Sequence, residues 1–269
     1  MTTRIDKKNR LYNLYLKEIS TVKFTQRQVD IIACLIHNRS YGKVADLLNI
    51  KSIRTVHAHV RDIKSKIDNS TTEFIIDFIE KSGKRKHLVE YYIEILTYSV
   101  FLKKLTKIKL ASNRSRIVCF IHPNNIREEH RKFINRLKDD LSVANILITE
   151  KIEDIENVQI VFVISGQDFD FSNTLLRNKK VIHFILSSGI KPEGEYIDFN
   201  SGTSYYFSVM KLIKTIINKE SINKIITDFE LEHKAINSSW HHDKIIKQTL
   251  KKDNSILPII LKITFYVAI

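Results

Sequence analysis

The segment "RTVHAHVRDIKSKI", residues 54–67, interleaves two arginines, two lysines and two histidines with valine and isoleucine. Its large aliphatic residues are spaced by four, three and four positions, which places them on one stripe of an α-helix. These residues are Val56, Val60, Ile63 and Ile67. The other side of the helix would carry Arg54, His57, Ala58, Arg61, Lys64 and Ser65. We therefore predict a helix that is anchored by an apolar stripe and presents a narrow basic face.

Two further helices are expected before this segment. Thr25 followed by Gln28 is the pattern of a capping box, and apolar residues recur behind it at helical spacing, so the sequence predicts a first helix over 26–37. Ser40 can cap a second helix, and residues 49–51 are expected to form a short turn. The basic helix thus follows a helix and a tight turn.

This arrangement is typical of a helix-turn-helix unit, with Ser52 as the cap of the basic helix. The basic face suits the major groove of DNA, because Arg61 can donate to guanine while the lysines meet phosphates. Behind it, Ser70 with Glu73 predicts another capping box and a fourth helix, which we expect to end at Gly83.

The stretch over residues 24–67, "FTQRQVDIIACLIHNRSYGKVADLLNIKSIRTVHAHVRDIKSKI", resembles the LuxR-type (GerE-type) helix-turn-helix domain of bacterial transcription regulators. The start of that domain is matched by Phe24, Thr25 and Arg27, with Gln28 in place of a glutamate, and its second helix by Ser40, Val44 and Ala45. Its recognition helix is matched by Ser52, Thr55, Val56, His59, Ile63, Lys66 and Ile67. The resemblance covers about residues 22–82, and Lys51 adds one residue to the usual turn, which can tilt the recognition helix.

The resemblance implies a DNA-binding surface and a dimer contact. It places His57, Ala58 and Arg61 toward the bases, and Thr55, Lys64 and Lys66 near the phosphate backbone. The predicted DNA-binding set is completed by Arg54 and Lys43. The fourth helix of the family usually forms a dimer interface, which would here involve Ile75, Phe78 and Ile79. On residue chemistry alone, His59 is more simply a packed structural residue.

The charge of the chain is concentrated in its first 110 residues. That part holds 22 Lys and Arg against 11 Asp and Glu, a net charge of +11, whereas residues 111–269 hold 22 against 19, a net charge of +3. Such an excess suits a polyanion, either nucleic acid or an acidic membrane surface. A generally lysine-rich composition is the alternative explanation, which the asymmetry weakens.

Cysteine usage and hydropathy indicate a cytoplasmic protein. Cys34 and Cys119 lie far apart without a partner motif, which fits a reducing compartment and favours neither a disulfide framework nor a zinc site. The apolar run over 256–269 is too short to cross a bilayer, so we expect a terminal strand or a docked segment and no membrane partner. No metal or other cofactor is predicted.

Residues 84–110 are expected to form one long connecting helix. Its apolar positions have near-heptad spacing, which favours packing on the rest of the chain slightly over pairing with a second copy. The stripe consists of Tyr91, Ile95, Tyr98, Leu102 and Leu105. Four lysines, Lys103, Lys104, Lys107 and Lys109, are expected to face solvent or flanking DNA.

From residue 116 onward, apolar runs alternate with helical segments, which indicates a parallel sheet with helices on both faces. The runs are "RIVCFIH" (116–122), "ANILITE" (144–150), "VQIVFVIS" (158–165), "KVIHFILSS" (180–188) and the weaker "EYIDF" (195–199). Helices are predicted over 127–141, 205–217 and about 221–252. Five strands in about 100 residues resemble a flavodoxin-like or receiver-like unit.

The residues for phosphoacceptor chemistry are missing from this unit. A receiver needs a pair of acids after the first strand and an Asp at the end of the third to hold Mg²⁺ and accept phosphate. Here the first strand ends in His122, Pro123 and Asn124, and Asp168 lies slightly beyond the third. The unit therefore resembles a degenerate receiver, without a catalytic constellation or a glycine-rich phosphate loop.

The fold expected from these patterns has two domains joined by a helix. Residues 1–83 form an all-α helix-turn-helix domain, 84–110 the connecting helix, and 111–269 an α/β domain with a helical C-terminal extension. The expected function is sequence-specific transcription regulation by a homodimer that is not an enzyme, with a small-molecule or protein effector at the α/β domain. Two alternatives stay open: a nucleotide-processing, TIR-like enzyme tethered to DNA, and a protein that binds an acidic partner.

Overall fold

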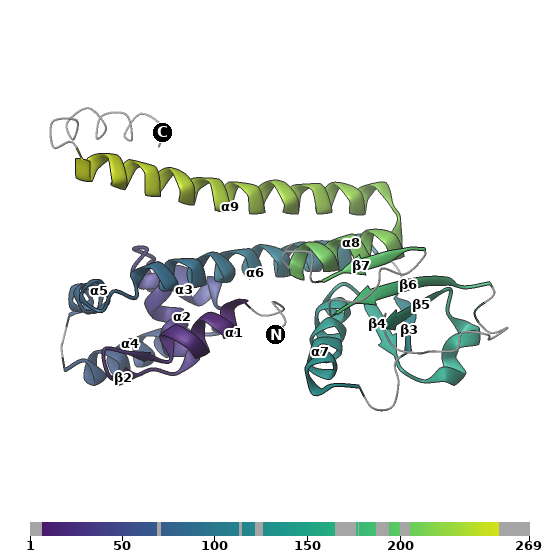
Figure 1. Cartoon of the computed structure of the whole chain (residues 1–269), viewed down its shortest axis with the longest axis horizontal. Coiled ribbons are helices and arrows are strands. Elements are labelled where there is room, and N and C mark those ends of the chain that lie inside the picture. The colour runs from purple at the N-terminus through teal and green to yellow at the C-terminus, as the bar shows by residue number, and fades with distance from the viewer. Residues whose placement is uncertain are drawn as a thin grey trace.

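The computed structural model describes residues 7–68, 71–112, 115–121, 126–164, 176, 178–186, 194–199 and 205–252, the last range with side chains up to residue 238. The described chain has a mixed α/β architecture, as predicted (Figure 1). Helices dominate up to residue 111, and a five-stranded parallel sheet with further helices follows.

Short elements and four helices precede residue 82. They are α1 (Lys7–Leu11), a π-helical turn η2 (Tyr12–Leu16), the antiparallel strands β1 (Glu18–Ile19) and β2 (Val22–Lys23), and helices α2 (Gln26–Leu35), α3 (Tyr41–Leu47), α4 (Ile53–Lys66) and α5 (Thr72–Lys81). Their apolar faces meet in one buried cluster, to which α2 contributes every residue from Val29 to Leu35 except Asp30. Helix α2 is therefore the central helix of this part.

Side-chain caps define where these helices begin. The predicted capping box is present: Thr25 Oγ1 accepts from the Gln28 amide at 3.3 Å, and Gln28 Oε1 accepts from the Thr25 amide at 3.0 Å. Helix α2 ends two residues before the predicted end, because the chain turns through Asn38 in the left-handed region (φ 54°). The cap of α5 is Thr71, whose Oγ1 accepts from the Phe74 amide at 3.4 Å. The predicted cap, Ser70, lies outside the described residues.

Helix α6 (Arg85–Ala111) runs through both parts of the molecule (Figure 1). Leu88, Tyr91 and Ile95 in its first half are buried in the helical cluster, while Phe101 and Leu105 in its second half are buried in the core of the α/β part. The helix is therefore a shared structural element, and packing within the chain, which the sequence favoured slightly, is what the structure shows.

The prediction that Lys104 faces solvent is wrong. Its side chain is only 4% exposed, and its ammonium lies 2.7 Å from Glu232 Oε1 and 3.8 Å from Asp228 Oδ2. Both acids belong to helix α9 (Glu220–Lys252), which packs on α6. The lysine is buried because α9 covers that side of α6. The other three lysines of this set are exposed, as expected.

The predicted apolar runs form a parallel five-stranded sheet. Its strands are β3 (Arg116–Ile121), β4 (Ile146–Thr149), β5 (Ile160–Ile164), β6 (Lys180–Ile185) and β7 (Tyr196–Asp198), in the order β4-β3-β5-β6-β7. Helix α7 (Glu128–Val143) follows β3, a 3₁₀ helix η3 (Ile152–Asn157) follows β4, and α8 (Tyr205–Ile217) lies between β7 and α9. This strand order is that of flavodoxin-like sheets.

The two faces of the sheet are covered differently. On β3, Val118 and Phe120 join the large core with helices α6, α7, α8 and α9, whereas Cys119 and Ile121 point to the opposite face. In the described part of the chain, that second face carries a small apolar cluster beside η3 and no α-helix. On that second face, the described residues supply only the 3₁₀ helix η3 of the predicted helical cover, and the segment after β5, residues 165–175, lies outside the described residues. Burial raises the pKa of the Cys119 thiol to about 11, so it is an inert core residue at neutral pH.

Within the described ranges, the structure contains no helix long and apolar enough to cross a membrane. The tail over 256–269, predicted as a strand or docked segment, lies outside the described residues.

Candidate nucleic-acid interface

Helix α4 is anchored by the apolar stripe that the sequence predicts. Val56, Val60 and Ile63 are buried in the helical cluster, and Ile67 packs against it at the end of the helix. The side chains of this stripe leave the opposite side of α4 available to solvent. The anchoring explains why a segment with so many charged residues forms a stable helix.

The turn before α4 has a defined geometry. Leu48 ends α3, Asn49 adopts the left-handed conformation (φ 50°), and the Ile50 amide donates to the Ala45 carbonyl at 2.9 Å. Ser52 then caps α4, its Oγ accepting from the Arg54 amide at 3.2 Å, as predicted. Asparagine tolerates this backbone region at low cost. Helix α4 therefore has a fixed orientation relative to α3.

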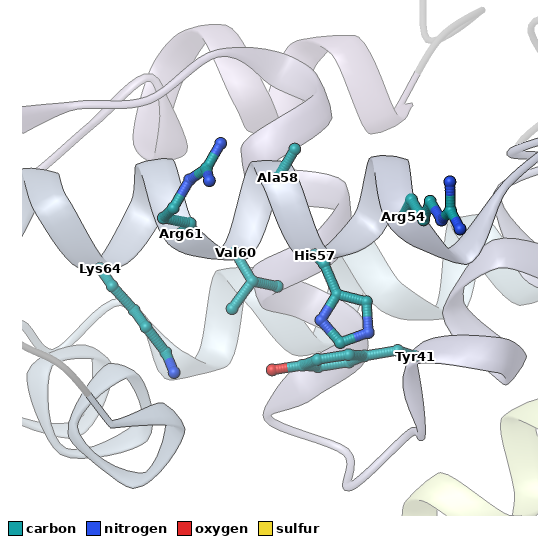
Figure 2. Close-up of a pocket in the computed structure, with 7 residues that line it drawn as sticks. All are labelled: Tyr41, Arg54, His57, Ala58, Val60, Arg61 and Lys64. Atoms are coloured by element: carbon teal, nitrogen blue, oxygen red, sulfur yellow. The ribbon is translucent and has the colours of Figure 1, made fainter.

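Two rows of side chains lie on the part of α4 that faces away from the helical cluster, and all of them except Ala58 are polar (Figure 2). Arg54, Ala58 and Arg61 form one row at spacings of four and three, and both arginines are exposed. His57 and Lys64 leave the helix on the neighbouring side, toward Tyr41 (Figure 2). Together these residues line a shallow surface hollow of about 460 Å³.

Tyr41 of α3 holds one of the predicted residues in place. Its ring lies edge-on to the imidazole of His57, with 4.6 Å between the ring centroids, and its hydroxyl is 3.3 Å from Thr72 Oγ1 (Figure 2). His57 is exposed but rests on this ring, so its position on α4 is restrained. The sequence analysis missed Tyr41, although an aromatic residue directly after the Ser40 cap is a signal for packing between α3 and α4.

Three other residues that the sequence analysis singled out lie on α3 and α4 and do not line this hollow. Thr55 and Lys43 are exposed in the first turns of α4 and α3, and His59 is half-buried on α4. The positive end of each helix dipole lies at those first turns, which favours a nearby anion. Thr55 and Lys43 therefore lie at helix ends that favour an anion.

Lys66 does not lie on the basic face. Its ammonium donates to the Lys23 carbonyl at 2.8 Å and to Gln28 Oε1 at 2.9 Å, and it lies 5.7 Å from the centroid of the Phe24 ring. The lysine thus fastens the end of α4 to the start of α2. The expectation that Lys66 contacts a phosphate is corrected, because its ammonium is directed to its own chain.

The residues predicted for a dimer contact are largely used inside the chain. Ile75 and Ile79 are buried in the helical cluster, and Phe78 is half-buried with its ring edge-on to Phe24 at 6.2 Å. A side chain that is covered by its own chain cannot contact a second copy, so the expectation is wrong for Ile75 and Ile79. On the outer side of α5, Phe74 is 39% exposed.

The strand order of the sheet reverses between β3 and β5, and in open α/β sheets ligands commonly bind at the carboxyl ends of the strands at such a point. The segments that follow these strands, 122–125 and 165–175, lie outside the described residues, as does Asp168. Among the residues that the structure does describe, no group of three or more His, Cys, Asp and Glu could hold a metal ion.

No family model, curated protein or solved structure matches this chain.

Proposed function

We propose that the protein is a sequence-specific transcription regulator that binds double-stranded DNA through a helix-turn-helix unit formed by α3 and α4. The observation that carries the proposal is the pair of exposed rows on α4, on a helix whose opposite side is fully anchored. A helix with its side chains is about 10–12 Å across, which matches the roughly 12 Å width of the major groove.

The side chains on the two rows fit different parts of a DNA groove. Arg61, at the C-terminal end of the row that also holds Arg54 and Ala58, can donate two parallel hydrogen bonds to guanine O6 and N7. Ala58 adds little bulk beside it, so the helix can approach the base edges closely. Arg54 and Lys64, toward the two ends, are placed to meet phosphates.

The charge of the chain supports the same assignment. The net charge of +11 in residues 1–110 provides long-range attraction to a polyanion, while the +3 of the remainder does not. Lys43 and Thr55 extend the basic face toward the flanking phosphates. His57, held by Tyr41, borders the face on the α3 side.

We further propose that the protein acts as a homodimer in the cytoplasm. The exposed ring of Phe74 on α5 replaces the buried isoleucines as the apolar contact. The α/β part is assigned a sensing or partner-binding role rather than catalysis, and phosphorylation is not part of its control.

The proposal is tested by selecting bound sequences from a random duplex pool at physiological salt. The wild-type protein, the variant Arg61→Ala and the control Arg131→Ala are compared side by side. Arg131 is exposed on α7 in the α/β part, so its variant removes the same charge away from the proposed face.

Wild type and Arg131→Ala are expected to enrich one symmetric motif. Arg61→Ala should lose discrimination at one position of each half-site, a cost of about 1–3 kcal/mol. Binding that enriches no motif and only fades with rising salt would contradict sequence recognition and would mean that the basic face meets phosphates alone.

A further inference from the structure

A second cavity lies where the helical part and the α/β part meet along α6. Its volume is about 610 Å³, within the range of about 300–1,000 Å³ that is typical of small-molecule sites. Helices α1, α2 and α3 supply one side, α7 and α8 supply the other, and α6 joins them (Figure 1). The cavity is therefore built from both halves of the molecule.

The surface that α6 contributes to this cavity is mainly apolar. Ile95, Tyr98 and Leu102 line it at spacings of three and four, and the Tyr98 side chain is 38% exposed. Tyr206 from α8 and Leu47 from α3 add to this surface. Such a lining suits an apolar body of the size of one or two rings.

The side formed by α1 and α2 carries an excess of positive charge. Asp30 is buried and accepts a hydrogen bond from the Tyr91 hydroxyl at 2.7 Å, while its two oxygens lie 2.8 Å from Lys8 Nζ and 3.5 Å from Arg27 NH1. Two cations thus share one carboxylate. Burial, together with the negative charge of Asp30, raises the pKa of the neighbouring Cys34 thiol to about 12, so that thiol stays neutral.

Arg27 is the more loosely held of the two cations. Its side chain is 46% exposed, and its hydrogen bonds to Asp30 and to the Leu48 carbonyl are long, at 3.5 and 3.4 Å. A guanidinium has five N–H donors in a planar fork that matches carboxylate and phosphate geometry. Arg27 can therefore take a bidentate anion without leaving a buried charge unpaired, because Lys8 stays with Asp30.

The side formed by α7 and α8 is close to neutral. Asp140 is buried, accepts from the Tyr205 hydroxyl at 2.8 Å and lies 3.8 Å from Arg136 Nε, while the Arg136 guanidinium stacks on the Tyr205 ring at 4.1 Å. Burial raises the pKa of the Asp140 carboxyl, and the Tyr205 hydrogen bond and Arg136 oppose that rise. Asp139, exposed on the same helix, adds a negative charge at this end. An anionic group is therefore favoured at the Arg27 end.

We propose that this cavity binds a small organic anion with a ring-sized apolar body, its acid group on Arg27 and its body against Tyr98 and Leu102. This proposal rests on the proposed function: if the protein is a DNA-binding regulator, this cavity is where its effector binds. The effector site is thus proposed at the junction of the helical and α/β parts, whereas the sequence analysis expected it in the α/β part alone.

The link to DNA runs through the end of α3. Leu48, whose carbonyl receives the Arg27 hydrogen bond, is the last residue before the turn that leads to α4, and Leu48 and Asn49 themselves line the cavity. An anion that draws Arg27 away from Leu48 changes the hydrogen bonding at this turn. Because the turn fixes the angle between α3 and α4, occupancy biases the position of the recognition helix.

The binding step is tested without DNA on the full-length protein. Titration calorimetry with 1-naphthoate and with uncharged 1-naphthamide compares an anion with a near-isosteric neutral molecule. Naphthoate should bind saturably with one site per chain, and naphthamide at least about tenfold more weakly. Equal binding of the two molecules, or no saturable binding of naphthoate at millimolar concentration, would overturn the assignment of an anion site.

Three variants locate the site. Arg27→Gln should weaken naphthoate about tenfold and leave naphthamide unchanged, whereas Leu102→Trp should reduce the binding of both by filling the cavity. The control is Arg131→Gln, which removes an exposed charge on α7 outside the lining and should bind like wild type. If the control weakens binding as much as Arg27→Gln, the acid group is not held by Arg27. Circular dichroism melting checks that each variant is folded.

The coupling step measures affinity for the selected DNA motif with and without saturating naphthoate. We expect a change of at least about fivefold in wild type, either up or down, and none in Arg27→Gln. Binding of naphthoate with an unchanged DNA affinity would overturn the coupling but not the site. If no DNA motif exists while naphthoate binds as described, the proposed function fails and the site stands.

Discussion

At the scale of single residues, Lys104 shows how a charged side chain can join two long helices. Its aliphatic stem lies between α6 and α9, and its ammonium reaches Glu232 and Asp228 at the surface. The two acids are about half exposed, so water screens them on one side, while the lysine itself has little access to water. The stability of this contact therefore depends on which partner is removed.

We predict that neutralising the acids destabilises the protein more than removing the lysine. In Asp228→Asn/Glu232→Gln the ammonium stays buried without an anion, at a cost of about 1–3 kcal/mol after allowance for the exposure of the acids. Lys104→Met keeps the packing and removes the charge, so its free energy of unfolding should be within about 1 kcal/mol of wild type. Urea unfolding monitored by circular dichroism measures both. A Lys104→Met protein as unstable as the double variant would contradict this account.

At the scale of elements, α4 depends on its first turn. The helix begins with an exposed segment from Ser52 to Thr55, and the first large buried side chain is Val56. The cap at Ser52 therefore orders the end of the helix that carries Arg54, one of the proposed DNA contacts.

Replacing Ser52 by alanine is expected to lower the free energy of unfolding by about 1 kcal/mol, because the Arg54 amide loses its acceptor. Ser52→Asp should restore most of the loss. Ser65→Ala, on the exposed side of the same helix, is the matched control and should change stability by less than about 0.5 kcal/mol. Chemical denaturation of the three variants decides the matter, and a loss in Ser65→Ala equal to that in Ser52→Ala would argue against the cap.

The elements also show what sequence periodicity can and cannot predict. The predicted strands end within three residues of the observed ones, since buried parallel strands are continuous apolar runs, and α8 matches its predicted range of 205–217. Periodicity reports which side of a helix is apolar, but not what covers the other sides. For this reason the burial of Lys104 under α9 was missed.

The same limit applies to the candidate sites. The exposed face of α4 follows from the spacing of Val56, Val60 and Ile63, because a buried stripe determines which residues face away from it. The hydrogen bonds from the Lys66 ammonium to the Lys23 carbonyl and to Gln28 depend on how the start of α2 packs against the end of α4. No local sequence pattern encodes that packing. The cavity at the junction likewise needs the tertiary arrangement, because its lining comes from α1 to α8.

At the scale of the whole molecule, three histidines connect stability to pH. His130 of α7, His183 of β6 and His233 of α9 have lowered pKa values because burial disfavours the charged imidazole. Nδ1 of His130 is buried, and it finds no hydrogen-bond partner in the described part of the chain. All three residues lie in or against the α/β part.

The free energy of unfolding is therefore expected to fall as the pH is lowered through about 6.5. The unfolded chain takes up protons there at ordinary histidines while the folded chain does not, and each site adds at most about 1.4 kcal/mol per pH unit. Asp140 acts in the opposite sense at lower pH, because its pKa is raised above 3.8 on folding: its contribution is greatest in acid and is lost as the pH rises.

Urea unfolding at pH 7.5, 6.5 and 5.5 gives the slope of the free energy of unfolding against pH. These three pH values bracket the ordinary histidine pKa of about 6.5. His130→Gln should show a smaller slope than wild type, whatever its absolute stability. A slope that is unchanged in the variant would mean that His130 titrates alike in the folded and unfolded chain.

The shared helix α6 also has a consequence for how the chain is made on the ribosome. The helical part cannot close its core until Leu88, Tyr91 and Ile95 have left the exit tunnel, so residues 1–83 emerge as an unfinished fold. Once that core closes, Phe101, Leu105 and Ile108 follow as an uncovered apolar surface, and their partners on the sheet, α8 and α9 are still to be synthesised. During synthesis the folded helical part is therefore followed, for a time, by the second half of α6 with its apolar residues exposed. Exposed apolar surface of this kind makes a partly folded chain prone to aggregate, which is why such chains need chaperones.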